Sequence, residues 1–335
     1  MGYLPRDIHF SIIIPVYHSG PFLKQALRSL MGLTYPHEGF EVLVGGNQDD
    51  EKSRRIVAGE AGSGDASIRF ITSPFEHKAA VLNAACCAAK GRYLIFTDDD
   101  CRFFPDWLER YESAFARDPE IGMIGGPDVL EDRASGFDRA LDYVLRSPLV
   151  TGRLPLPGSK RLVKYYPKLF NMAVTRSVVL EVSRAGEGVP PHVFDESLMV
   201  HEDVDLARKI EQSGRKLKFC PEVRVKHFRD TNMRDFLMRN FQLGRACRTL
   251  KVHRLPQTLL SVLILGLGAS LVTALVFGTL GGVVFLIPGA YVLILVASAI
   301  HGSLRTRSPG ALVRIPCLMA GLHISRGLGY GIPSQ

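Results

Sequence analysis

The chain has 335 residues and a formal net charge of +8, and 46% of its residues are hydrophobic. This length supports a full hydrophobic core and two or three structural units. The six cysteines form no CxxC pair and have no zinc-type spacing with histidine. We therefore expect neither a zinc-binding module nor a fold held together by disulfides.

Charge is distributed unevenly along the chain. Residues 1–225 carry a net charge of −2, whereas residues 226–335 carry a net charge of +10. Because the basic part flanks a very apolar region, an anionic membrane surface is a better expected partner than a nucleic acid.

The first part of the chain alternates strands and helices. Phe10–Val16 is a near-continuous apolar run, which is typical of a strand buried on both faces. Further strands are predicted over Phe40–Val44, Ile68–Thr72 and Tyr93–Thr97, and helices over Pro21–Leu30 and His77–Lys90. This rhythm predicts an α/β fold with a parallel, doubly wound sheet, in which ligands bind beyond the carboxyl ends of the strands.

The middle of the chain has a mixed pattern. Helices are predicted over Pro105–Phe115 and over Val204–Ser213, the second closed by Gly214. Strands are predicted over Ile121–Gly126, Phe170–Val174 and Lys216–Val225. The stretch Arg133–Pro167 has no clear period and is expected to form an irregular flap that faces an acceptor.

A long apolar run follows. Leu259–Ile300 has 42 residues without a charge, which is enough for two membrane-spanning helices with a turn at Gly281-Gly282. Buried helices of a soluble domain are the alternative. Ala311–Ile324 is shorter and contains Arg314, so it is expected to be an interfacial or re-entrant helix, with its residues from 315 onward facing lipid.

Three consecutive carboxylates, Asp98, Asp99 and Asp100, come directly after the predicted strand Tyr93–Thr97. Side chains alternate faces along a strand, so Asp98 and Asp100 are expected to point to the same side. Two carboxylates at the end of a strand suit a hard divalent cation that carries substrate phosphates. A solvated acidic turn that caps the next helix is the alternative.

Five further segments complete an order of motifs around this triplet. They are Ile13–Tyr17 (IIPVY), His77–Asn83 (HKAAVLN), Pro105–Leu108 (PDWL), His201–Leu206 (HEDVDL) and Gln242–Arg245 (QLGR). This order resembles glycosyltransferase family 2 with its GT-A catalytic domain, over roughly residues 8–250. The resemblance implies a catalytic domain at 1–250, and the apolar run and the segment after it predict two transmembrane helices at 256–300 and an interfacial or re-entrant segment at 301–335.

The same resemblance implies roles for particular residues. The nucleotide-sugar donor is expected to contact Pro15, Tyr17, Asn47, Lys78, Asn83, Asp98, Asp99, Arg239 and Arg245. A divalent metal, Mn²⁺ or Mg²⁺, is expected on Asp98, Asp100 and His227. His227 could instead be a packed or surface residue, Lys78 a solvated one, and the two arginines could face lipid headgroups.

The acceptor is a hydroxyl, which needs a general base within reach. Asp203 is the first candidate because it sits at the start of a predicted helix, where the dipole favours an ionised carboxylate. Its neighbour Glu202 could exchange roles with it, and both could simply cap the helix.

Two positions depart from the family's pattern. Where the family has an aspartate that reads the nucleobase, this chain has Gly46, so Asn47 or Asp49 would have to replace it or a uridine donor is in doubt. Arg245 is followed by Ala246, where processive synthases have tryptophan, which favours a single transfer.

The sequence therefore predicts an inverting, metal-dependent glycosyltransferase. A uridine diphosphate sugar is the expected donor, and a lipid or lipid-linked sugar is the expected acceptor. Basic residues flank the apolar run on both sides: Arg245, Arg248, Lys251 and Arg254 before it, and Arg305, Arg307 and Arg314 after it. They predict a multi-pass protein of the cytoplasmic membrane with its catalytic domain in the cytoplasm. A processive polysaccharide synthase subunit and a non-catalytic nucleotide-binding module are the alternatives.

Overall fold

The computed structural model describes residues 8–17, 22–61, 67–75, 77–131, 134–151, 165–183, 192–198, 200–228, 231–251, 254–277 and 286–332. The chain divides into two compact units. The first unit is Met1–Glu131 with Tyr166–Phe228, and the second is Asp132–Tyr165 with Arg229–Gln335. The expected domains at 1–250, 256–300 and 301–335 have different limits, and their functional meaning stays a prediction.

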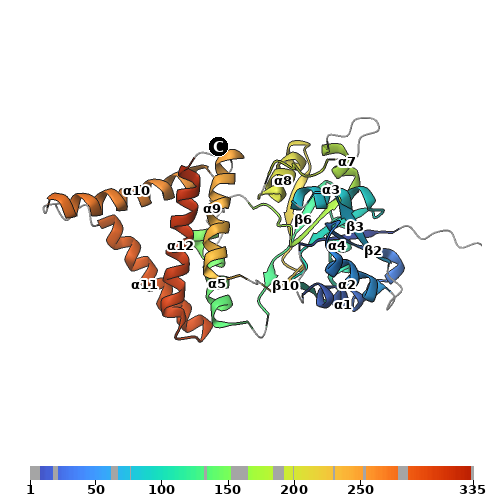
Figure 1. Cartoon of the computed structure of the whole chain (residues 1–335), viewed down its shortest axis with the longest axis horizontal. Helices are drawn as coiled ribbons and strands as arrows, with labels where there is room; N and C mark the ends of the chain where they lie inside the picture. The colour runs from blue at the N-terminus through green and yellow to red at the C-terminus, as the bar shows by residue number, and fades with distance from the viewer. Residues whose placement is uncertain are drawn as a thin grey trace, which may run out of the picture. The chain divides into compact units, whose positions relative to one another are not determined.

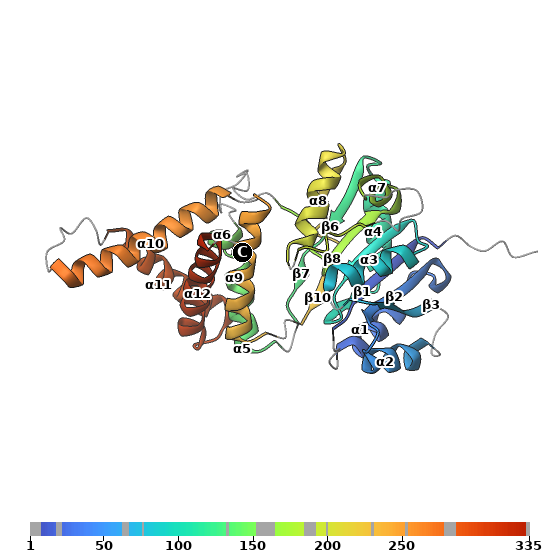
Figure 2. The same cartoon turned by 45° about the horizontal axis from the view of Figure 1, so that its top comes forward.

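A seven-stranded sheet forms the centre of the first unit (Figures 1 and 2). Its strands are β1 (Phe10–Pro15), β2 (Phe40–Asn47), β3 (Ser67–Ser73), β4 (Tyr93–Thr97), β6 (Ile121–Gly125), β8 (Asn171–Thr175) and β9 (Lys216–Phe219), in the order β3-β2-β1-β4-β8-β6-β9. Strand β8 runs antiparallel to both of its neighbours, and the other pairs are parallel. The predicted doubly wound sheet is confirmed, but β8 makes it mixed, so the expectation of parallel pairing throughout is wrong.

Helices cover the sheet on both faces. They are α1 (Phe22–Met31), α2 (Glu51–Ala61), α3 (Lys78–Ala88), α4 (Trp107–Ala116), α7 (Arg176–Val182) and α8 (Glu202–Gln212), with a 3₁₀ turn η1 (His37–Gly39). Side chains alternate between the faces as expected for strands. Ile12 and Ile14 of β1 pack into the main core with Leu27 of α1, whereas Ile13 is buried outside that cluster. Gly214, with a φ of 85°, ends α8 as predicted.

A buried asparagine ties α4 to the sheet. The Oδ1 atom of Asn171 accepts hydrogen bonds from Trp107 Nε1 at 3.1 Å and from Tyr111 Oη at 2.8 Å. Its Nδ2 atom donates to the Val223 carbonyl at 2.9 Å. Since Asn171 pairs with Thr97 across β4 and β8, this hub sits beside the start of the aspartate triplet.

A second sheet, of three strands, begins directly after the aspartate triplet in the first unit. It consists of β5 (Cys101–Phe103), β10 (Val225–His227) and β7 (Asp128–Val129), in the order β5-β10-β7. The single strand predicted over Lys216–Val225 is therefore wrong. A turn separates β9 from β10, and the two strands belong to different sheets, so His227 is carried beside Cys101.

The second unit is helical. Its helices are α5 (Gly136–Arg146), α6 (Pro148–Thr151), α9 (Met233–Thr249), α10 (Arg254–Phe277), α11 (Leu286–Thr306) and α12 (Ala311–Gly331). The prediction that Arg133–Pro167 is irregular is wrong for α5, which begins with a capping box between Ser135 and Asp138. Residues 152–164 of that stretch lie outside the described residues.

The core of the second unit lies around α12, which runs beside α9 in Figure 1. Its buried members on α12 are Ala311, Ile315, Leu318, Met319 and Leu322, and they pack with Ala140, Leu141 and Val144 of α5 and Phe236 of α9. The expectation that this stretch faces lipid is wrong for those side chains. They pack against apolar residues of α5 and α9 and not against lipid. Within α12, Ile324 is among the exposed residues.

Among the described residues, one stretch is long and apolar enough to cross a membrane, Pro288–Thr306 in α11. Exposed apolar side chains occur along both α10 and α11, including Val262, Leu265, Val272, Val276, Val292, Leu293 and Leu304. The predicted turn at Gly281-Gly282 lies outside the described residues. The two-span hairpin therefore stays a prediction.

Candidate functional site

The aspartate triplet forms a tight turn after β4. The backbone N–H of Cys101 donates to the Asp98 carbonyl at 3.2 Å, so strand alternation does not continue through the triplet as we expected. The side chains instead face different partners. Lys78, from the first turn of α3, places its Nζ atom 3.1 Å from Asp98 Oδ1.

The third aspartate meets the predicted histidine. Asp100 Oδ1 lies 3.1 Å from His227 Nε2, and Asp128 Oδ2 lies 3.8 Å from the Nδ1 atom of the same ring. The ring of Phe170 packs beside His227 at a centroid distance of 4.9 Å. Burial lowers the pKa of His227, but its hydrogen bond to Asp100 and the nearby carboxylate charges raise it more, so this pKa lies above the ordinary value.

The donor set at this position fits a divalent cation. Asp100, Cys101 and His227 offer ligand atoms that all lie within 4.8 Å of one another. Cys101 is buried, and burial holds the pKa of its thiol well above the ordinary value. A carboxylate and an imidazole are therefore the better ligands, which suits Mn²⁺ or Mg²⁺ more than a thiolate-seeking metal. The structure brings Asp100 and His227 together as predicted, while Asp98 lies against Lys78.

The two candidate bases stand at the first turn of α8. Glu202 and Asp203 are both buried, with 8% of each residue exposed. The residue before them, His201, has a φ of 69°, a left-handed conformation that is uncommon for any residue except glycine. Such strain persists only where the surroundings enforce it, and it is concentrated at functional sites.

Each candidate base has its own electrostatic surroundings. Asp203 Oδ2 lies 3.4 Å from Lys168 Nζ, and its Oδ1 accepts the backbone N–H of Val204 at 2.8 Å. Burial raises the pKa of Glu202, the charge of Lys78 opposes that shift, and the Asp203 and Asp98 charges add to it. The sensitivity of Glu202 to Lys78 and Asp98 means that α8 and the end of β4 form one electrostatic site.

Residues at the ends of β1 and β2 lie on the same edge of the sheet. Pro15 pairs with Gly45, and Tyr17 just beyond it is 63% exposed. Asn47 ends β2 and is half-buried. The predicted substitute Asp49 is exposed. Their contacts with a donor stay predictions.

The environment of Gly46 explains why no side chain stands there. A Cβ atom added to Gly46 would lie 2.7 Å from Phe70 Cζ and 3.1 Å from Val16 Cγ2. Phe70 occupies the space into which a side chain at this position would extend, and Arg54 stacks over the Phe70 ring at 5.0 Å. A carboxylate at position 46 is therefore incompatible with the present packing of Phe70.

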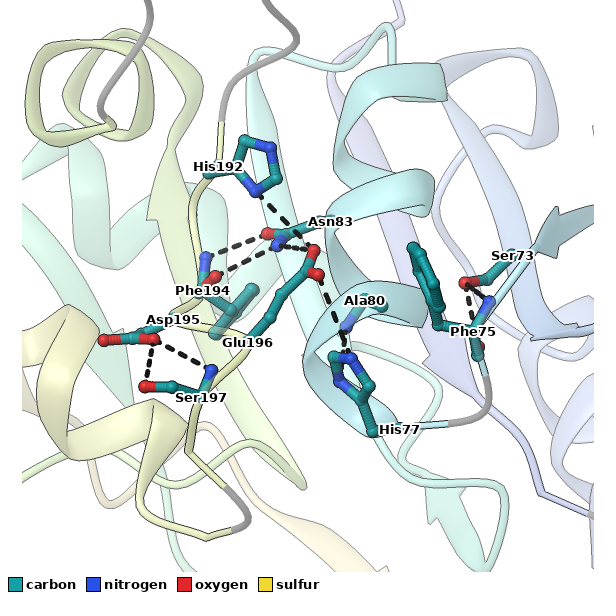
Figure 3. A network of polar contacts seen from close by, with 10 residues as sticks. All are labelled: Ser73, Phe75, His77, Ala80, Asn83, His192, Phe194, Asp195, Glu196 and Ser197. Atoms are coloured by element: carbon teal, nitrogen blue, oxygen red, sulfur yellow. Dashed lines mark hydrogen bonds and ion pairs between the residues drawn. The ribbon is translucent and has the colours of Figure 1, made fainter.

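Asn83 uses its amide inside the first unit, as Figure 3 shows. Its Nδ2 atom donates to the Phe194 carbonyl at 3.0 Å and to Glu196 Oε1 at 2.9 Å, and its Oδ1 atom accepts the Phe194 N–H at 2.9 Å. Glu196 also lies 3.9 Å from His77, which caps α3. Asn83 thus ties the 194–196 segment to α3, and a direct donor contact stays a prediction.

The two arginines predicted to bind the diphosphate belong to the second unit. Arg239 and Arg245 lie on α9, where Arg239 is exposed and Arg245 is half-buried. Gly244, between the two, packs where α9 meets the Arg326 carbonyl of α12, so part of the motif around Arg245 has a packing role. The part that both arginines play in donor binding stays a prediction.

Reasoning from the sequence missed three residues of the site. Lys168 contacts Asp203, Asp128 approaches His227, and Asn171 anchors the strand beside Asp98. Lys168 directly follows the stretch Arg133–Pro167 that we expected to be irregular, and Asn171 lies in the predicted strand Phe170–Val174. Asp128 follows a glycine pair, and only the pairing of β7 with β10 reveals its role.

Comparison with known proteins agrees with this geometry. The family model for glycosyl transferase family 2 matches residues 11–178, which is half of the chain. A glycosyltransferase of Haloferax volcanii, AglE, is 27% identical over 213 residues that cover 64% of each chain. The pre-mycofactocin glycosyltransferase of Mycobacterium tuberculosis is 24% identical over 255 residues, which are 76% of this chain and 49% of that protein. The chain thus spans about half to two thirds of the length of these relatives.

A solved structure supports the fold over nearly the whole chain. It is the mannosyltransferase PcManGT of Pyrobaculum calidifontis in complex with GDP-Man and Mn²⁺, with a TM-score of 0.63 and 16% sequence identity. The match covers 95% of this chain and 86% of that one. The predicted GT-A fold is therefore confirmed, and the chain belongs to glycosyl transferase family 2.

Proposed function

We propose that this member of glycosyl transferase family 2 transfers a sugar from a nucleotide-sugar to a lipid or lipid-linked acceptor at a membrane. The reaction is metal-dependent and inverts the configuration of the transferred sugar. One observation carries the proposal: Lys78 contacts Asp98 at the end of β4, and the buried carboxylates of Glu202 and Asp203 begin α8 close enough for the charges of Lys78 and Asp98 to affect the pKa of Glu202. Groups suited to donor binding and groups suited to proton removal thus share one site.

The donor side of this site needs positive charge, because the leaving group is a diphosphate. Asp100 and His227 would hold Mn²⁺ or Mg²⁺. When bound, the cation neutralises charge on the departing diphosphate. Lys78 supplies a fixed positive charge beside Asp98, and Arg239 and Arg245 are the proposed further contacts of the diphosphate.

On the acceptor side, Asp203 removes the proton from the attacking hydroxyl. Lys168 at 3.4 Å and the N-terminus of α8 stabilise the negative charge of its carboxylate. Glu202 next to it has a raised pKa because it is buried, so it holds its proton more readily than an ordinary glutamate. The contact with Lys168 and the position at the first turn of α8 favour Asp203 as the group that accepts the proton.

The site could accept a nucleobase other than uracil, because no carboxylate stands at position 46. A carboxylate at position 46 would read the N3–H of uracil, but Phe70 fills the space beside Gly46. Asn47 and the exposed Tyr17 are the remaining polar and aromatic groups that we predicted at this edge of the sheet. A uridine diphosphate sugar stays our expected donor, and guanosine diphosphate sugars are its first competitors.

A membrane location is proposed from the second unit. The stretch Pro288–Thr306 is long and apolar enough to span a bilayer, and Val262, Leu265, Val272 and Val276 of α10 are exposed. Arg305 and Arg307 follow the end of the apolar run, which favours a cytoplasmic position for that end. Labelling of a cysteine placed at Ser303 from the cytoplasmic face only would support this topology, and labelling from the external face only would overturn it.

An assay of donor hydrolysis tests the enzymatic proposal against a non-catalytic nucleotide-binding module. Purified full-length protein is incubated with a panel of nucleotide-sugars, with Mn²⁺ or with a chelator. Release of the nucleoside diphosphate from one donor, with Mn²⁺ only, is the expected result. Binding of a nucleotide without turnover of any donor, in the presence of an extract of membrane lipids as acceptor, would contradict the proposal.

A further inference from the structure

Asp128 approaches the far side of the histidine that we place in the metal centre. It stands in β7, and its Oδ2 atom is 3.8 Å from His227 Nδ1. The opposite ring nitrogen, Nε2, is 3.1 Å from Asp100. The imidazole therefore lies between two carboxylates, one of which belongs to the proposed cation site.

The register of the small sheet brings these side chains together. Strand β10 pairs in parallel with β7, so that Val225 stands opposite Asp128. His227 is two residues further along β10 and projects from the same face as Val225. Asp128 and His227 are thus diagonal neighbours on one face, which is within reach of a carboxylate and an imidazole.

The ring of His227 has little freedom in this position. Its side chain is 14% exposed, Phe170 packs beside it, and β10 also pairs with β5 on its other edge. Within the described part of the chain, the Nδ1 atom is buried and has no partner at hydrogen-bond distance. A buried N–H group needs an acceptor, and Asp128 is the carboxylate that stands toward it.

We propose that Asp128 is a positioning residue that accepts the Nδ1–H of His227 and thereby leaves Nε2 free to bind the divalent cation beside Asp100. A histidine that binds a metal through one nitrogen usually donates the other N–H to a carboxylate or carbonyl, which fixes its tautomer and orientation. This inference rests on the metal dependence proposed above. It assigns a partner to the second ring nitrogen, Nδ1, which the metal does not contact.

The test compares two substitutions of Asp128 by measuring Mn²⁺ binding in the full-length protein. Free Mn²⁺ is measured by electron paramagnetic resonance in the presence of UDP. Asp128→Ala removes both the acceptor and the charge and should weaken Mn²⁺ binding about 10–100-fold. Asp128→Asn keeps an acceptor oxygen without the charge and should lose less. Equal losses in the two variants would mean that only the charge matters and would overturn the inference.

A double substitution shows whether Asp128 acts through His227. In a His227→Ala background, Asp128→Ala should cause no further loss of Mn²⁺ affinity, because the group it positions is gone. Additive losses of Mn²⁺ affinity would mean that Asp128 binds the cation directly or attracts it through its charge. Either result would contradict a positioning role. Asp118→Asn is the matched control, since Asp118 contacts Lys216 in the same unit, and it should bind Mn²⁺ like the wild type.

A readout without metal completes the design. In ¹⁵N NMR spectra of Asp100→Ala protein, which lacks the competing carboxylate 3.1 Å from Nε2, the neutral His227 ring should carry its proton on Nδ1, and adding Asp128→Ala should shift the ring toward the other tautomer. Unchanged tautomer populations would overturn the inference even if affinity fell through altered folding. Failure of the wild type to bind Mn²⁺ would remove the metal centre itself and this inference with it, whereas normal wild-type binding with an unaffected Asp128→Ala variant would remove the inference alone.

Discussion

The two units of this protein bury different kinds of group. In the first unit, half-buried carboxylates follow the end of β4, the buried pair Glu202 and Asp203 begins α8, and the backbone beside that pair is strained at His201. In the second unit the core is apolar, and helices approach closely at Gly244 of α9. The contrast teaches that charge concentrated at strand ends carries the chemistry, whereas close apolar packing builds the helical unit. Substitutions of the site carboxylates in the first unit should therefore affect catalysis before stability, and substitutions at the close helix contacts of the second unit should do the reverse.

The largest effect is expected from Asp203→Asn. The amide keeps the shape of the carboxylate but cannot accept the proton, so kcat should fall about 10²–10⁴-fold. Donor binding, measured by calorimetry, and the unfolding midpoint should change little. The matched variant is Glu202→Gln, which should keep more activity than Asp203→Asn. The opposite ranking would move the base to Glu202, and full activity in both would make this segment structural.

In the second unit, Gly244→Ala should reduce stability without touching the chemistry. A Cβ atom there would lie against the backbone carbonyl oxygen of Arg326, so α9 and α12 would have to separate. Overpacking of this kind costs about 1–3 kcal/mol. The control is Gly268→Ala on α10, where an added Cβ meets nothing within 4 Å. Thermal unfolding in detergent should show a loss for Gly244→Ala only, and equal midpoints would contradict the close packing of α9 and α12.

A glycine in the first unit tests whether Phe70 determines the residue at position 46. Gly46→Ala places a methyl group 2.7 Å from Phe70 Cζ, which should cost about 1–3 kcal/mol of unfolding free energy, less if the ring can move. The same change in a Phe70→Leu background should cost clearly less, as a double-mutant cycle in denaturant would reveal. Additive effects would show that Phe70 is not the obstacle to a side chain at position 46.

The smallest effect concerns the pH dependence of stability through Glu202. Burial raises the pKa of Glu202, so between its ordinary value and its raised value the folded state binds more protons than the unfolded state. The contribution of Glu202 to stability therefore falls as pH rises through that window. Glu202→Gln should raise the unfolding midpoint at neutral pH, and the gain should vanish below the ordinary pKa of glutamate. A gain that is independent of pH would contradict this electrostatic origin.

Much of the first unit could be predicted because its signals are local. The apolar run Phe10–Val16 and the Ala-rich stretch His77–Lys90 correspond to β1 and α3, since a buried strand and a helix have distinct periods. The predicted partnership of Asp100 with His227 is also present. That pairing could be expected only through the resemblance to the family, because the two residues are far apart in the sequence.

What could not be predicted depends on contacts between distant segments. Asp128 and Lys168 acquire their roles from the pairing of β7 with β10 and from the approach of the 168 segment to α8. Helix α5 was missed because its apolar face is matched to α12, which follows much later in the chain. We missed the tight turn of the triplet because we assumed that side chains keep alternating between the two faces of the strand beyond Thr97, where β4 ends.

The central claim is that Asp100 anchors a divalent cation at which the nucleotide diphosphate binds. The most direct measurement is calorimetric titration of wild-type and Asp100→Ala protein with UDP and with GDP, each with Mn²⁺ and with a chelator. The wild type should bind one of the two nucleotides more tightly with Mn²⁺ than with the chelator. In Asp100→Ala that difference should disappear, while a soluble fold is retained by circular dichroism. A metal dependence that is the same in Asp100→Ala as in the wild type would contradict the account.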